Sequence, residues 1–264
     1  MSTLTLSPRR VGLLIRHDLA SQRKSLTTGF LVIAGVAFGI FLLASATGGR
    51  SAVLANTFVN ILLIGGYVTS SLAFSELHDP KTGTHYMMLP GSTLEKYTAK
   101  LLVTSVGWTV AVIVVFAVGT VLGYLVSLVF FAENPGVYLP ASRGVWISIA
   151  TYLVTQSIFL FGSIYFRKVA FLRTALSVFV VAISLGIVYL VAIRVFFAPA
   201  FVGTFETVRG VEQMITGPNG VSLTDFAVES IFPVLETLQR ILLWVVTPVF
   251  FWVAGVIRLR ETEV

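Results

Sequence analysis

Charged residues are absent from six long stretches of this chain, and these gaps dominate what it can fold into. They lie between Lys24 and Arg50, Arg50 and Glu76, Lys100 and Glu133, Arg143 and Arg167, Arg173 and Arg194, and Arg240 and Arg258. Each gap holds about the 20 mainly apolar residues that a helix needs to cross a bilayer. Of all residues, 56% are hydrophobic and only 11% charged, which is too little charge for a water-soluble surface. The sequence therefore predicts a membrane protein.

The expected spans are residues 29–46, 51–74, 101–131, 144–166, 174–198 and 241–257. Barrel strands would appear as alternating segments of about ten residues, whereas these are continuous apolar blocks. In lipid, a helix satisfies its own backbone hydrogen bonds. We therefore predict an all-α integral membrane protein, with residues 1–264 forming a single transmembrane domain of six helices.

Lysine and arginine are unevenly divided between the two sides of these spans. Thirteen fall on one side: Arg9, Arg10, Arg16, Arg23, Lys24, Lys81, Lys96, Lys100, Arg167, Lys168, Arg173, Arg258 and Arg260. Five fall on or toward the other: Arg50, Arg143, Arg194, Arg209 and Arg240. The cation-rich side is expected to be cytoplasmic, with both termini there. The net charge of +6 then indicates contact with anionic membrane lipids rather than nucleic acid.

Two segments outside the spans have their own character. In residues 8–26, cations such as Arg9 and Arg16 recur every seven residues opposite an apolar arc. This spacing predicts an amphipathic helix in the cytoplasmic interface. A solvated basic tail is the alternative. Residues 199–240 form an external insert in which the turn residues 217–220 separate two expected short helices. Ser222 and Asp225 have capping-box-like spacing after that turn.

The loop between the second and third spans, from Ser75 to Lys100, is the polar centre of the chain. Ser92 and Glu95 have the spacing of a capping box, so a helix is expected to begin at Thr93. That helix contains no proline before the third span ends, which gives a rod of nearly forty residues, about 58 Å long at the standard rise. The bilayer core is only about 30 Å thick, so three arrangements are open: the rod projects into the cytoplasm at its start, tilts within the membrane, or breaks near Gly119 and Gly123. A projecting end, with the flanking side chains Met87, Met88 and Tyr97, is a candidate docking knob for another protein.

The residues from Tyr86 to Tyr97 resemble the Leu-Pro-x-Ser-x-x-Glu-Lys element in permease subunits of ABC exporters of the second type. The matching positions are Leu89, Pro90, Ser92, Glu95 and Lys96, while Gly91 departs from the expected alanine. The overall plan is also similar: an amphipathic helix, six spans, a polar cytoplasmic loop after the second span and an external helical insert before the sixth.

This resemblance implies a function. In that family the cytoplasmic loop docks onto a separate ATP-hydrolysing subunit, two permease subunits pair, and closure of the ATPases moves substrate across the cytoplasmic (inner) membrane of a bacterium. Carried over to this chain, residues 75–98 become the coupling segment. The expected coupling residues are Glu76, His78, Asp79, Pro90, Ser92, Glu95 and Lys96.

Several absences bear on catalysis. The chain has no Gly-x-x-x-x-Gly-Lys-Ser/Thr phosphate loop, so ATP and Mg²⁺ are expected on the partner ATPase, with no cofactor in this chain and no enzymatic activity of its own. There is no cysteine, which excludes thiolate sites and disulfides. His17, His78 and His85 lack a metal-ligand spacing. The predicted spans contain no acidic residue, which argues against ion coupling.

Polar and small residues within the spans have two interpretations each. Asn56, Asn60 and Gln156 are either hydrogen-bonding partners between helices or polar positions along a substrate path. Gly35 and Gly39, like the pair at positions 119 and 123, have the spacing that lets helices approach closely. We place Gly35 and Gly39 at the interface between two copies, with packing inside one copy as the alternative.

Two other functions remain open from the sequence. The chain could be a non-catalytic multi-pass membrane scaffold or sensor, in which the external insert binds a ligand and the basic helix responds to the membrane. An ion channel ranks last, because the spans contain no evident selectivity filter or charged ring.

Overall fold

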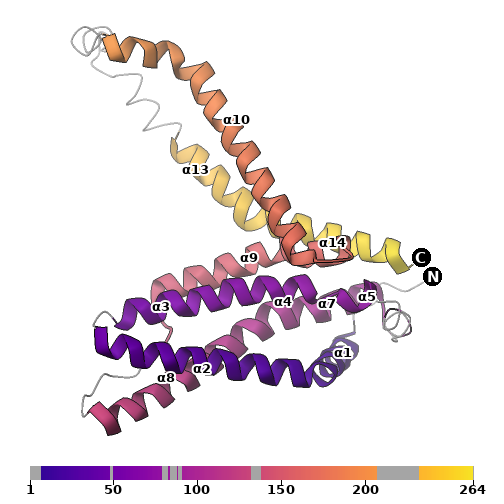
Figure 1. Cartoon of the computed structure of the whole chain (residues 1–264). Coiled ribbons are helices and arrows are strands. Elements are labelled where there is room, and N and C mark those ends of the chain that lie inside the picture. Colours follow the sequence, from indigo (N-terminus) through magenta and orange to yellow (C-terminus); the bar gives the residue numbers. More distant parts are fainter. Residues whose placement is uncertain are drawn as a thin grey trace. The chain divides into compact units, whose positions relative to one another are not determined.

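The computed structural model describes residues 7–47, 50–78, 83, 88, 91–131, 138–206 and 232–263. Within these residues the regular structure is entirely helical (Figure 1). They belong to two compact units: one contains the chain up to Phe171 and from Pro248 onward, and the other contains Leu172–Thr247. Each unit is considered by itself.

Six helices are long and apolar enough to cross a bilayer. They are Leu26–Ser45, Ser51–His78, Thr93–Val129, Arg143–Tyr165, Ala170–Val191 and Thr237–Thr262. These helices overlap all six spans expected from the charge gaps, so the prediction of an all-helical fold with six spans is confirmed. The chain is a multi-pass membrane protein.

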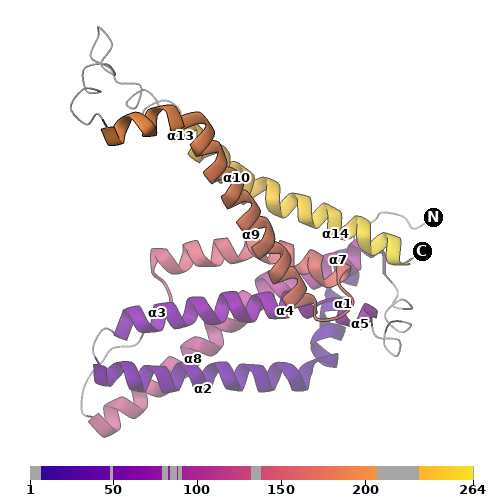
Figure 2. The same ribbon diagram turned by 45° about the horizontal axis from the view of Figure 1, so that its top comes forward.

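The larger unit is a bundle of long helices lying side by side (Figures 1 and 2). Its members are α2 (Arg23–Thr47), α3 (Arg50–Asn60) with its continuation α4 (Gly66–Leu72), α8 (Trp108–Phe131) and α9 (Arg143–Tyr165). The core is built from aromatic and branched side chains of these helices, including Phe41, Phe58, Phe116 and Tyr152. The rings of Phe58 and Phe116 meet edge to face with centroids 5.4 Å apart, the geometry that aromatic pairs favour.

Two of the bundle's rods contain a π-helical turn. Ile61–Gly65 joins α3 to α4, and Val103–Gly107 joins α7 (Thr93–Leu102) to α8. The indole Nε1 of Trp108 donates to the carbonyl of Leu62 across 3.1 Å and so ties one rod to the other. A Cβ at Gly65 would lie 2.5 Å from that indole ring, so glycine is needed for this close approach.

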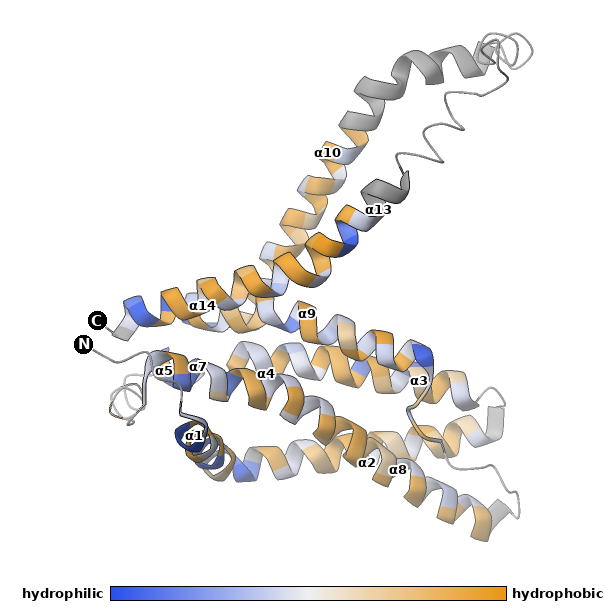
Figure 3. Cartoon of the chain, turned by 180° about the vertical axis from the view of Figure 1, so that it is seen from behind, coloured by the Kyte–Doolittle hydropathy of each residue, from blue (hydrophilic) through white to orange (hydrophobic). Residues whose placement is uncertain are grey.

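Hydrophobic residues occupy much of the length of these helices (Figure 3). Leu31, Leu43, Val110, Val129 and Ile147 are among the many large hydrophobic side chains that are exposed. In water such continuous apolar surface marks an aggregation or interaction site. Around a bundle of spans it is the surface that faces lipid tails.

The remaining elements differ from expectation mainly at their ends. Helix α1 covers Pro8–Ser21 and stops before residue 26, because α2 already begins at Arg23. The short α5 covers Ser75–His78. The fifth span lies in α10 (Ala170–Glu206), and this helix continues into the expected insert. The sixth span begins in α13 (Phe232–Ile241), passes through a π-helical turn and continues in α14 (Thr247–Glu263). The predicted turn at 217–220 and the pair Ser222 and Asp225 lie outside the described residues.

Candidate functional site

Helix α7 begins at a complete capping box. The Oγ of Ser92 accepts from the amide of Glu95 across 3.2 Å, and the Oε2 of Glu95 accepts from the amide of Ser92 across 2.9 Å. These reciprocal bonds satisfy two amides that a helix N-terminus would leave unpaired. The predicted capping box is confirmed, as is the uninterrupted rod, because α7 runs through Val103–Gly107 into α8.

Glu95 also holds the start of a second helix. Its other oxygen, Oε1, accepts from the amide of Ser7 across 2.9 Å, and Ser7 is the N-cap residue of α1. The hydroxyl of Ser7 makes no capping hydrogen bond of its own. The buried carboxylate of Glu95 therefore accepts hydrogen bonds from the N-termini of two helices, α1 and α7. Ser7 and Glu95 are 88 positions apart in the chain.

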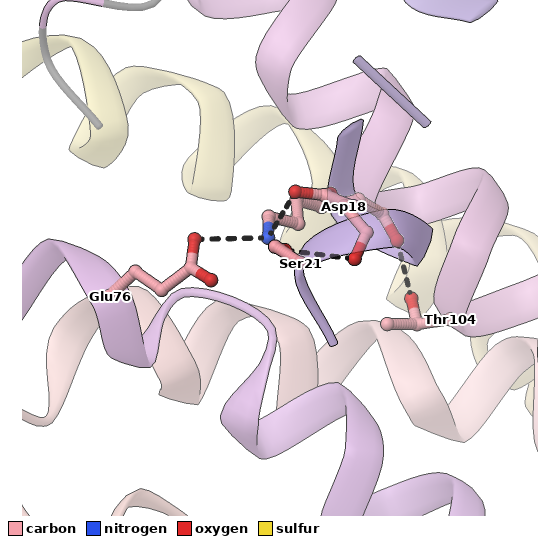
Figure 4. A network of polar contacts seen from close by, with 5 residues as sticks. Asp18, Ser21, Glu76 and Thr104 are labelled. Carbon is pink, nitrogen blue, oxygen red and sulfur yellow. Dashed lines mark hydrogen bonds and ion pairs between the residues drawn. The ribbon is translucent and has the colours of Figure 1, made fainter. Parts of the chain in front are cut away.

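Further along α1 and α7, the buried Lys100 pairs with two acids, Asp18 and Glu76, of which Glu76 is partly exposed. Figure 4 shows this network with Asp18, Ser21, Glu76 and Thr104 labelled. The Nζ of Lys100 lies 3.0 Å from Oδ1 of Asp18 in α1 and 3.6 Å from Oε2 of Glu76 in α5. The hydroxyl of Ser21 donates to the Asp18 carbonyl, and the hydroxyl of Thr104 donates to the Lys100 carbonyl. Buried charges are tolerated when they are paired in this way. The network fixes α1, α5 and α7 to one another.

Helix α5 is also attached to the fourth span. The Nε2 of His78 lies 3.0 Å from the carbonyl oxygen of Ser163, so this nitrogen is the donor. Ser163 lies in the last turn of α9, where carbonyls have no partner within the helix. His78 therefore donates a hydrogen bond to one of the free carbonyl groups at the end of α9.

An apolar cluster lies close to these contacts. The rings of Phe74 and Tyr97 stack with centroids 6.1 Å apart, and Leu160, Ile164 and Leu259 complete the cluster. Tyr97 is only 2% exposed. The expectation that Tyr97 forms part of a protruding docking knob is therefore wrong, because this ring packs inside the bundle.

The expected coupling residues fall into three groups. Glu95 and Lys96 are buried, while Glu76, His78 and Ser92 are partly exposed. Asp79 and Pro90, like Met87, lie outside the described residues. Met88 is 76% exposed, which makes it the accessible member of the expected knob in the described part of the chain.

We use the name α1–α7 junction for six residues that hold these helices: Ser7, Asp18, Glu76, Ser92, Glu95 and Lys100. Sequence reasoning identified Ser92 and Glu95 from their local spacing, and Glu76 from the family resemblance. It missed Ser7, Asp18 and Lys100. One signal for Asp18 was present in the sequence: it is an acid within the otherwise basic segment that forms α1.

The three polar residues considered for a substrate path do not form one surface. Gln156 is fully buried, and its Oε1 accepts from the hydroxyls of Ser70 and Thr104, each at 3.3 Å. Gln156 therefore forms hydrogen bonds between helices. Asn56 and Asn60, one turn apart on α3, are exposed in the single chain. Their side chains remain available to a cargo or to a second subunit.

The two glycine pairs also differ. A Cβ at Gly119 would lie 2.6 Å from the Ala34 carbonyl oxygen, and one at Gly123 would lie 2.7 Å from the Phe41 ring, so this pair packs α8 against α2. At Gly35 and Gly39 nothing lies within 4 Å of the added carbon. Gly35 and Gly39 therefore form a small-residue surface that no described neighbouring helix covers in the single chain. An interface between two copies requires such a surface.

Among the described residues, no three His, Asp or Glu side chains come together as a metal site would require. The described contacts attach the capped end of α7 to α1 and α5, which makes this end a rigid part of the bundle. No family model, curated protein or solved structure matches this chain.

Proposed function

We propose that this chain is the membrane-spanning subunit of an ATP-driven ABC exporter and that residues 75–98 couple it to a separate ATPase subunit. The proposal rests on the Leu-Pro-x-Ser-x-x-Glu-Lys resemblance together with the six spans. The single observation that supports it best is that the capped helix of this motif is the first part of the third span.

The dimensions of this rod suit a coupling role. The uninterrupted helix Thr93–Val129 has 37 residues, or about 55 Å at the standard rise. The hydrocarbon core of a bilayer is about 30 Å thick. We take the surplus length to extend the capped end beyond the lipid tails, so that a force applied to this end would be transmitted to the span through continuous backbone hydrogen bonds.

The α1–α7 junction would distribute such a force among several helices. Glu95 and Lys100 join α7 to α1, which leads directly into the first span, and Lys100 also joins α7 to α5. His78 connects α5 to the end of the fourth span. Movement of the cytoplasmic loop would thus displace the first, third and fourth spans together.

The junction changes the assignment of roles within the coupling segment. Glu95 already accepts two backbone hydrogen bonds and is buried, so we assign it to positioning the helix and not to touching the ATPase. The partner's contact surface would instead include exposed side chains such as Met88. ATP and Mg²⁺ would be bound by the partner, and a second copy or a homologue would complete the substrate path.

The chemistry of the spans favours one class of cargo over another. The predicted spans carry no acidic residue, and the exposed faces of the helices are largely apolar with polar positions such as Asn56 and Asn60. These surfaces suit an amphipathic or lipid-like cargo better than a small ion. The membrane would be the bacterial cytoplasmic membrane, with both termini on the cytoplasmic side.

Purification from native membranes, followed by reconstitution, tests this proposal. We expect a soluble subunit with a phosphate loop to co-purify in mild detergent, and we expect its ATP hydrolysis to drive vectorial movement of labelled lipid in proteoliposomes. An ATPase with its phosphate-loop lysine replaced provides the control. Partner binding without any movement would favour the scaffold or sensor, and movement without nucleotide would contradict ATP coupling.

A further inference from the structure

A groove of about 370 Å³ lies between α1 and α7. Pro8, Gly12 and Ile15 form one wall, and Thr98, Leu101 and Leu102 form the other. Its accessible surface is apolar, and the groove is open to the surroundings of the protein and not enclosed. Its volume lies within the range of about 300–1,000 Å³ that is typical of ligand sites.

The groove lies where the charged part of α7 gives way to the apolar part of the third predicted span. Lys100 is the last charged residue before the third span, and no further charge occurs before Glu133. Leu101 and Leu102 directly follow Lys100 and line the groove. Its apolar walls therefore begin where the charged part of α7 ends, a pattern that suits a lipid with its acyl chain beside the apolar part and its head group beside the charged part.

Cations flank the groove on the α1 side. Arg9 and Arg16 lie three residues before and four residues after Gly12, so all three share one side of the helix. Both arginines are exposed. The only acid in α1, Asp18, already pairs with Lys100. The open side of the groove is therefore bordered by positive charge that Asp18 does not neutralise.

We propose that this groove binds one anionic phospholipid of the surrounding membrane, with an acyl chain between α1 and α7 and the phosphate beside Arg9 and Arg16. The apolar walls provide the site for the chain, and the arginines favour an anionic head group. Guanidinium groups match phosphate oxygens with paired hydrogen bonds. The bound lipid would contact both helices of the α1–α7 junction.

Lipid binding to the purified full-length chain tests this proposal by native mass spectrometry. The probes are dioleoylphosphatidylglycerol and, as the zwitterionic comparison, dioleoylphosphatidylcholine. We expect a one-lipid adduct that forms preferentially with phosphatidylglycerol, and a rise in melting temperature with that lipid because ligands stabilise the state that they bind. Equal binding of both lipids would overturn the proposal.

Gly12→Leu fills the groove and should abolish the selective adduct. A Cβ at Gly12 meets nothing within 4 Å, and replacing glycine in a helix favours folding, so loss of the adduct would not result from misfolding. Gly29→Leu is the matched control, because Gly29 is also an exposed helical glycine with open space around it. An adduct that survives Gly12→Leu, or that Gly29→Leu removes equally, would contradict the proposed site.

Arg16→Gln tests the head-group contact separately. A cation near an anionic lipid surface contributes roughly a fivefold gain in binding, so we expect phosphatidylglycerol affinity to fall about fivefold. Arg143→Gln removes the same charge from the start of α9 and should leave the affinity unchanged. Equal effects of both variants would show that net charge, not this site, governs binding. The assay contains no ATPase, so its outcome is independent of the transport proposal.

Discussion

The Nζ of Lys100 lies 3.0 Å from the Oδ1 of Asp18, although the two residues are 82 positions apart in the chain. Both side chains are largely buried, with exposed fractions of 5% and 11%. The pair connects the helix before the first span to the helix that begins the third. The stability of this end of the bundle should therefore depend on the pair.

Asp18→Asn should destabilise the protein more than the loss of a surface charge does. Removing one partner of a buried ion pair costs about 3–5 kcal/mol, and we expect the low end of this range because Glu76 still faces Lys100. The measurement is the free energy of unfolding in mixed micelles. Glu261→Gln breaks the exposed Arg258–Glu261 pair and should cost less than about 1 kcal/mol. Equal losses would refute the buried network.

Ser92→Ala should loosen the first turn of α7. Loss of an N-cap side chain typically costs about 1 kcal/mol, and the amide of Glu95 loses its acceptor. Hydrogen exchange of the Glu95 amide should accelerate. Ser142→Ala is the control at another N-cap, where the hydroxyl accepts from Val145 at the longer distance of 3.4 Å; there, the first turn of α9 should open while α7 is unaffected. Unchanged exchange at Glu95 would count against the capping box.

Gly119→Ala should weaken the packing of α2 against α8. The new Cβ would lie 2.6 Å from the Ala34 carbonyl oxygen, and overpacking of this kind costs about 1–3 kcal/mol. Thermal denaturation in detergent provides the measurement.

Gly35→Ala makes the same change on open surface and should leave the stability of the single chain unaltered. If Gly35 and Gly39 join two copies, this variant should weaken self-association measured by cross-linking or energy transfer. Stable dimers of Gly35→Leu would place the interface elsewhere.

The orientation of the chain can be tested by labelling single cysteines, because the natural sequence contains none. Met88→Cys, at a side chain that is 76% exposed, should react with an impermeant maleimide only after the inner face of the membrane is opened. Leu139→Cys, at a residue that is 64% exposed before α9, should react from outside in intact cells. The reverse pattern would place residues 75–98 outside the cell and exclude coupling to a cytoplasmic ATPase.

Met88→Glu should reduce the binding of the ATPase without affecting the fold. A new charge on an exposed residue changes stability by about 0.5 kcal/mol or less, whereas it disfavours an apolar contact with a partner. Co-purification and stimulation of ATP hydrolysis measure the effect, and Leu139→Glu is the control. Charge changes at Glu95 or Lys96 are unsuited to this test, because both side chains are buried and Glu95 belongs to the α1–α7 junction.

Local sequence patterns determined much of this protein. The six helices follow from charge-free apolar stretches, because each span must satisfy its own backbone in lipid whatever its neighbours are. The Ser92–Glu95 box follows from residues three positions apart. The coupling assignment depends on family resemblance and is still a prediction, as is the pairing of two copies.

Only the tertiary structure decided which residues meet. Gly35 and Gly119 start equally spaced glycine pairs, yet Gly119 packs against a neighbouring helix and Gly35 does not. Tyr97 and Met88 both flank the same motif, but one is buried and the other exposed. The contacts of Ser7 with Glu95 and of Asp18 with Lys100 span more than 80 positions. Such contacts depend on how α1 lies along α7, and that arrangement is set by the packing of whole helices and not by the spacing of residues within one.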